Sequence, residues 1–94
     1  MVNLLIKTFD ENYRIAKGAI EVEKLNPHDP NIKKEIDDLP FVDSVKDAIY
    51  ELLAESVIKE NLLTAQDPDT KEKIGKLKLD ENIKNKIYKI LRIA

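Results

Sequence analysis

The sequence predicts an all-α fold, a small bundle of three to four helices in a single domain over residues 1–94. Apolar residues recur at spacings of three and four in several long segments, which is the pattern of amphipathic helices. Prolines lie between these segments, where they end one helix or open the next. The composition, 43% apolar and 36% charged, is that of a globular protein with an ionic surface.

The first helix is expected over about residues 2–25. Its apolar face comprises Val2, Ile6, Phe9, Tyr13, Ala16 and Ile20. Asn26-Pro27 ends it, because a residue before proline is pushed out of the α region. A short second helix should follow Asp29-Pro30, in which Asp29 can cap and proline suits the first helical position. Ile32, Ile36 and Leu39 would form its apolar face.

The third helix is expected over residues 41–63, with one apolar side formed by Phe41, Val45, Ile49, Leu52 and Leu53. Residues 61–79 allow two interpretations. Asp67-Pro68 would open a helix, whereas Lys76 to Leu79 alternates like a strand of a short hairpin. We favour helix or irregular structure there. A last helix should begin at Asp80 and continue towards Arg92, with Ile83, Ile87, Ile90, Leu91 and Ala94 on its apolar face.

Charge is distributed unevenly along the chain. Residues 1–39 carry a net charge of −2, residues 40–69 carry −5, and residues 70–94 carry +5. The acidic middle and the basic end could attract each other within the fold or could address different partners. We see no internal repeat and no low-complexity linker.

The residues of known catalytic motifs do not occur together. The chain has no cysteine, and His28 is its only histidine, which we interpret as an exposed loop residue. Ser44 and Ser56 have no nearby histidine base. Two glycines are too few for a phosphate-binding loop.

Carboxylate metal sites are also incomplete. Asp67-x-Asp69 resembles the start of a calcium loop, but Lys78 stands where the bidentate glutamate is required. Glu35 and Asp38 match half of the carboxylate pairing of helical nucleotide pyrophosphatases. We therefore expect no enzyme activity, no metal and no cofactor.

Three surfaces are candidates for binding partners. On the third helix, Tyr50 and Ile58 lie opposite the expected core side, among carboxylates spaced four residues apart. That candidate protein-docking surface comprises Asp43, Asp47, Tyr50, Glu51, Glu55 and Ile58. The usual role of such an acidic ladder is a solvated face.

The first helix carries a second apolar strip formed by Leu4, Ile15 and Val22, with Gly18 beside it. We expect the protein's own chain to wrap both sides of this helix, and a subunit contact through the strip is the alternative. Clustered cations near the C-terminal end are candidates for contacting nucleic-acid phosphates. These cations are Lys84, Lys86, Lys89 and Arg92.

The sequence thus favours a non-catalytic protein-interaction module, an accessory subunit or adaptor that docks on a larger assembly. The alternative is a nucleic-acid-associated accessory factor that uses the basic end. Cytoplasmic localisation is expected, because the chain lacks cysteine, a signal-peptide pattern and an apolar run long enough to span a membrane. Abundant Lys, Glu and Ile resemble the composition of hyperthermophile proteins.

Overall fold

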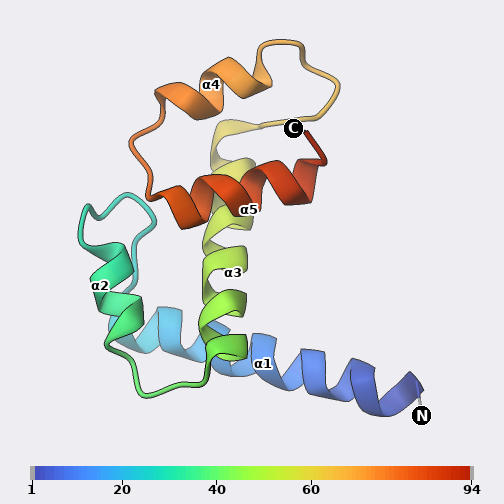
Figure 1. The fold of residues 1–94 in the computed structure, drawn as a ribbon, viewed down its shortest axis with the longest axis vertical. Helices are drawn as coiled ribbons and strands as arrows, with labels where there is room; N and C mark the ends of the chain where they lie inside the picture. Colours follow the sequence, from blue (N-terminus) through green and yellow to red (C-terminus); the bar gives the residue numbers. More distant parts are fainter. Residues whose placement is uncertain (1, 94) are drawn as a thin grey trace.

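The structure, a computed structural model, describes the backbone of residues 2–93 and the side chains of residues 11–93. It contains five helices: α1 (Val2–Glu23), α2 (Ile32–Asp37), α3 (Asp43–Asn61), α4 (Thr70–Lys76) and α5 (Glu81–Leu91) (Figure 1). No strand occurs among the described residues, so the all-α prediction is confirmed. The segment 61–79 folds as α4 with flanking loops and not as a hairpin.

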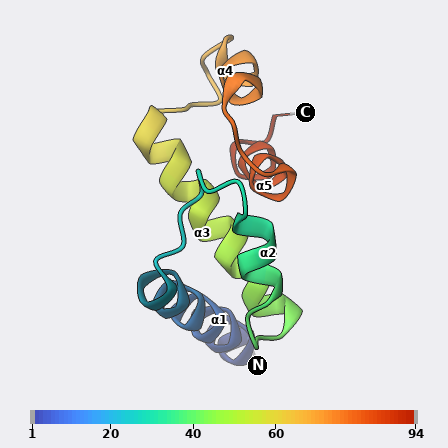
Figure 2. The same ribbon diagram turned by 90° about the vertical axis from the view of Figure 1, so that its left-hand side faces the viewer.

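Helix α3 is the centre of the fold. Helix α1 crosses its N-terminal half and α5 crosses its C-terminal half, so that α3 is covered at two levels (Figures 1 and 2). Buried residues consequently follow two sides of α3. They are Val45, Ala48, Ile49, Tyr50, Leu53, Ala54 and Val57. The N-terminal half of α1 extends past α3 at the edge of the molecule (Figure 1).

The short helices are fixed to this frame by few side chains. Helix α2 buries Ile32 and Ile36, and α4 buries Thr70 and Ile74. Helix α5 begins at the expected cap, where the Asp80 carboxylate accepts a hydrogen bond from the Asn82 backbone N–H at 2.9 Å. Its apolar face buries Ile83 and Ile87. Burial of one apolar face accounts for most of the stability of α2, α4 and α5, since isolated helices of this length are marginal in water.

The fold contains an internal repeat. Residues 25–39 and 63–77 lie 38 positions apart. In each copy an apolar residue follows the long helix, an Asp-Pro pair opens the turn, and isoleucine and leucine end the short helix. These features are Leu25, Asp29-Pro30, Ile36 and Leu39 in the first copy, and Leu63, Asp67-Pro68, Ile74 and Leu77 in the second.

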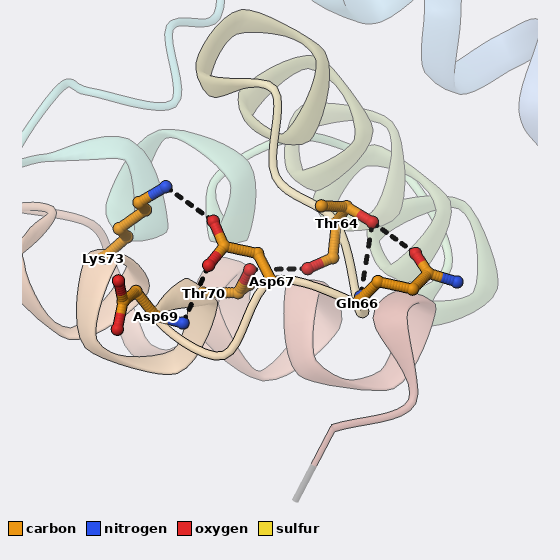
Figure 3. Close-up of polar contacts among 6 residues, drawn as sticks. All are labelled: Thr64, Gln66, Asp67, Asp69, Thr70 and Lys73. Carbon is orange, nitrogen blue, oxygen red and sulfur yellow. Dashed lines mark hydrogen bonds and ion pairs between the residues drawn. The ribbon is translucent and has the colours of Figure 1, made fainter.

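Backbone hydrogen bonds repeat with the same offset. Lys24 and Leu62 both have φ of 52°, and the next N–H bonds the carbonyl oxygen five residues back in both copies. The N–H of Asn31 bonds the Asp29 carboxylate at 2.9 Å, and that of Asp69 bonds the Asp67 carboxylate at the same distance (Figure 3). Each unit is thus a long helix, an Asx turn and a short helix.

The prediction that the chain has no internal repeat was therefore wrong. Few residues are identical between the two copies, because most positions in them are exposed and accept any polar side chain. What recurs is the small set of residues that determine the backbone conformation of the turn and fill the core. We call residues 5–42 the first repeat and residues 43–80 the second repeat; α5 follows the second repeat.

Candidate functional site

An open groove runs between the C-terminal half of α1 and the segment that leads from α2 to α3. Its volume is about 330 Å³. Its lining is apolar apart from one carboxylate: Ile15, Gly18, Ala19, Val22, Glu23, Leu39, Pro40 and Phe41. The groove is thus a mostly apolar surface concavity with a single ionisable side chain, Glu23, in its lining.

The α1 side of this groove is exposed to solvent. The side chain of Ile15 is 43% exposed and that of Val22 is 79% exposed. A Cβ atom placed on Gly18 would meet nothing within 4 Å. The expectation that the protein's own chain wraps both sides of the first helix is therefore wrong at this strip, because α3 covers only the opposite face. Leu4, the third residue of the predicted strip, lies outside the residues whose side chains are described.

The two apolar residues at the centre of the predicted docking surface on α3 do not face solvent. Tyr50 is only 8% exposed, and Ile58 is partly buried against the core. The prediction that these two residues face solvent was wrong, because it assumed one buried side of α3 and the structure has two. Burial raises the pKa of Tyr50 to about 12, aided by Asp37 and Asp80. Its hydroxyl has no hydrogen-bond partner among the residues that the structure describes.

Carboxylates of the α3 ladder connect α3 to its neighbours. Asp47 pairs with Lys86 of α5 at 2.7 Å, and Glu51 accepts a hydrogen bond from the Tyr13 hydroxyl of α1. That bond, with burial and the charge of Glu51, raises the pKa of Tyr13 to about 12. Asp43 is exposed and Glu55 is half-buried. Partner binding by these carboxylates stays a prediction.

The predicted basic residues lie in three different surroundings. The side chain of Lys86 is 18% exposed and engaged with Asp47. This ion pair and that of Lys73 with Asp67 join the basic end to the acidic middle inside the fold. Lys89 and Arg92 are exposed. Lys84 is half-buried and lines a hollow of about 580 Å³ together with Lys76, Lys78, His28, Asp29 and Asp80. The two carboxylates in that lining offset part of the positive charge.

Other candidate chemistry does not assemble among the described residues. Within residues 11–93, no three histidine, aspartate or glutamate side chains are grouped so that they could hold a metal ion. His28 is 42% exposed, and its Nε2 lies 2.8 Å from the Glu60 carboxylate. This pair joins the turn of the first repeat to the end of α3.

Sequence reasoning identified Ile15 and Val22 but missed the other wall of the groove. Leu39 was assigned to the core of the short helix, Pro40 to its end and Phe41 to the next helix. The available signal was an apolar tripeptide, Leu39 to Phe41, between two helices where polar loop residues are usual.

Comparisons with family models, with curated proteins and with solved structures found no match to this chain. None of the described helices is long and apolar enough to cross a membrane.

Proposed function

We propose that this protein is a non-catalytic, cytoplasmic interaction module that docks on a protein partner through the groove beside α1. The observation that carries the proposal is the open apolar wall formed by Ile15 and Val22 around Gly18. Contiguous apolar surface rimmed by charged residues is typical of interaction sites.

The repeat strengthens this proposal. The end faces of repeat proteins are usually polar, since no neighbouring repeat covers them. In the second repeat, the positions equivalent to Gly18 and Val22 are Ser56 and Glu60, both polar. In the first repeat these positions hold the half-buried Gly18 and the apolar Val22, which is 79% exposed. Exposure to solvent does not account for the lack of polar residues at these positions of the first repeat, whereas binding of a partner there does.

A photo-crosslinking amino acid at position 22 tests the proposal. In a lysate of the source cells, it should give one discrete adduct, because Val22 would lie at the centre of the interface. The same group at position 71, which is exposed on α4, is the matched control and should give none. Ile15→Gln should lower the adduct yield by removing apolar contact beside the probe. Equal labelling from both positions, or no adduct at position 22, would rule out docking at this groove.

A nucleic-acid-associated role is the second candidate. It is favoured by the convergence of Lys76, Lys78 and Lys84 on one hollow. Lys89 is exposed on the same helix as Lys84, and Arg92 is exposed directly after that helix. Its test is binding of generic duplex DNA at physiological salt. Loss of binding in a Lys84→Ala, Lys89→Ala, Arg92→Ala variant, with a reduced salt dependence, would support phosphate contacts by these residues.

A further inference from the structure

We infer that the partner of the groove face is a second copy of this chain, with the two α1 helices packed antiparallel about a two-fold axis at Gly18. This inference rests on the proposed function, since it names the occupant of the same surface. A two-fold dimer buries the same patch on both copies, so the patch must be complementary to itself. The described residues of α1 meet that condition in packing and in charge.

The apolar residues match across the axis. In an antiparallel pair, a residue before the axis faces one equally far after it on the other copy. Ile15 lies three residues before Gly18, and Val22 lies four residues after it. Helices rise about 1.5 Å per residue, so Ile15 of one copy and Val22 of the other differ in height along the helix axes by the rise of about one residue. Ile15 of each copy therefore contacts Val22 of the other copy, and the two exposed side chains of the strip cover each other.

The charges on the flank match in the same register. Arg14 and Glu21 are both exposed and lie on one side of the strip, at 100° per residue. Arg14 is four residues before Gly18 and Glu21 is three after it. Each Arg14 then faces Glu21 of the other copy, which gives two attractive pairs. Flanking charges of this kind set the orientation of paired helices.

Gly18 lies where the two backbones would be closest. Its missing side chain allows the helices to approach. Apart from the adjoining part of α1, no described atom lies within 4 Å of the place that a Cβ would take. The groove wall at Leu39 and Phe41 lies beside Ala19 and widens the apolar contact beyond the two helices. A helix face with a glycine between two aliphatic residues thus fits a copy of itself at close distance.

The test is sedimentation equilibrium of the full chain over micromolar to millimolar concentration, with charge-exchange variants. The wild type should approach twice the chain mass of 10.8 kDa. Arg14→Glu and Glu21→Arg should each lower the association constant at least about tenfold, because both pairs become repulsive. The double variant restores opposite charges and should recover the wild-type constant to within about threefold. Lys71→Glu, at an exposed position of α4 away from α1, is the control and should leave association unchanged.

Three results would overturn the inference: a wild type that stays monomeric at millimolar concentration, a dimer indifferent to Arg14→Glu, or a double variant that remains weakened. Circular-dichroism melts of each variant in dilute solution separate loss of association from loss of fold. Crosslinking from position 22 separates this inference from the proposed function. A monomeric protein that forms an adduct with a different chain retains the docking surface and excludes the second copy, whereas absence of any adduct removes both.

Discussion

The two repeats follow the same backbone path but present opposite surfaces. In the first repeat, Gly18, Val22 and Pro40 lie along an apolar groove. Their equivalents in the second repeat are Ser56, Glu60 and Lys78, all exposed and polar or charged. The hydrogen bonds that fix the turns are shared, so the difference is not required by the fold. Residues that repeat specify the structure, whereas an exposed apolar residue that has a polar equivalent in the other repeat is not needed to specify it.

The largest contrast between the repeats is expected at Tyr50, whose equivalent in the first repeat is the polar residue Asn12. Tyr50→Ala should lower the free energy of unfolding by about 3–5 kcal/mol, because it empties a buried aromatic site between α3 and its neighbours. Tyr50→Phe should be neutral or slightly stabilising, since the buried hydroxyl has no partner. Urea denaturation measures both. A destabilised Phe variant would reveal a hydrogen bond to bound water.

The next contrast is at Thr70, which stands where the first repeat has Ile32. Both side chains are buried, but the Thr70 hydroxyl also donates a hydrogen bond to the Thr64 carbonyl oxygen (Figure 3). Thr70→Val keeps the volume and removes that bond, so it should cost about 1 kcal/mol. The comparison is with Ile32→Val, which makes no polar change and should cost about 0.5–1.5 kcal/mol through lost packing. A neutral Thr70→Val would mean that packing alone holds the second turn.

Comparing these elements shows how far sequence reasoning reaches. The long helices could be predicted, since Val45, Ile49 and Leu53 repeat with helical spacing. The two-sided burial of α3 could not, because periodicity indicates which residues are apolar and not how many neighbours a helix has. Tyr50 was misplaced for that reason. Only one wall of the groove could be predicted. Ile15 and Val22 lie on one helix, whereas Phe41 comes to the groove only through the tertiary fold.

The repeat escaped detection for a related reason. Asp29-Pro30 and Asp67-Pro68 were each recognised as helix starts, but the residues between them share backbone conformation more than identity. Lys24 and Leu62 both adopt a left-handed conformation that usually selects glycine, and neither is glycine. A residue type that would have marked the equivalence is thus absent from both turns.

A smaller effect is expected at the two glycines, both in helices and both with open space at the Cβ position. Gly18→Ala should raise the free energy of unfolding by up to about 1 kcal/mol, through the higher helix propensity of alanine. Gly75→Ala should give less, because Gly75 lies in the last turn of the short helix α4. Thermal melts in dilute solution measure both. If alanine stabilises α4 but destabilises α1, the face around Gly18 is already in contact with another chain under those conditions.

The smallest contrast concerns two equivalent side-chain pairs with opposite pH dependence. In the second repeat, Lys73 Nζ lies 2.7 Å from the Asp67 carboxylate and, through that hydrogen bond, lowers the pKa of Asp67 (Figure 3). In the first repeat the position of Lys73 is taken by Glu35, and a hydrogen bond with Asp29 raises the pKa of Glu35. A depressed carboxyl pKa stabilises the fold above the unfolded-state pKa, and this contribution is lost as the pH falls. A carboxyl group whose pKa is raised in the folded state stabilises the fold at low pH, and this contribution is lost as the pH rises.

Exchanging the residues should therefore exchange the behaviour. Glu35→Lys gives the first turn the Asp–Lys pair of the second, and should raise the melting temperature at pH 7 with no gain at pH 2.5. Lys73→Glu should lower the melting temperature at pH 7, and this loss should disappear in acid as both carboxyls become protonated. Lys71→Glu makes the same charge change at another exposed position of α4 and serves as the control.

Melting temperatures from pH 2.5 to 8 measure all three variants. If Lys73→Glu and Lys71→Glu shift the melting temperature equally at every pH, net charge and not the Asp67–Lys73 pair controls the second turn. Because these side chains are exposed, high salt should reduce the difference at pH 7.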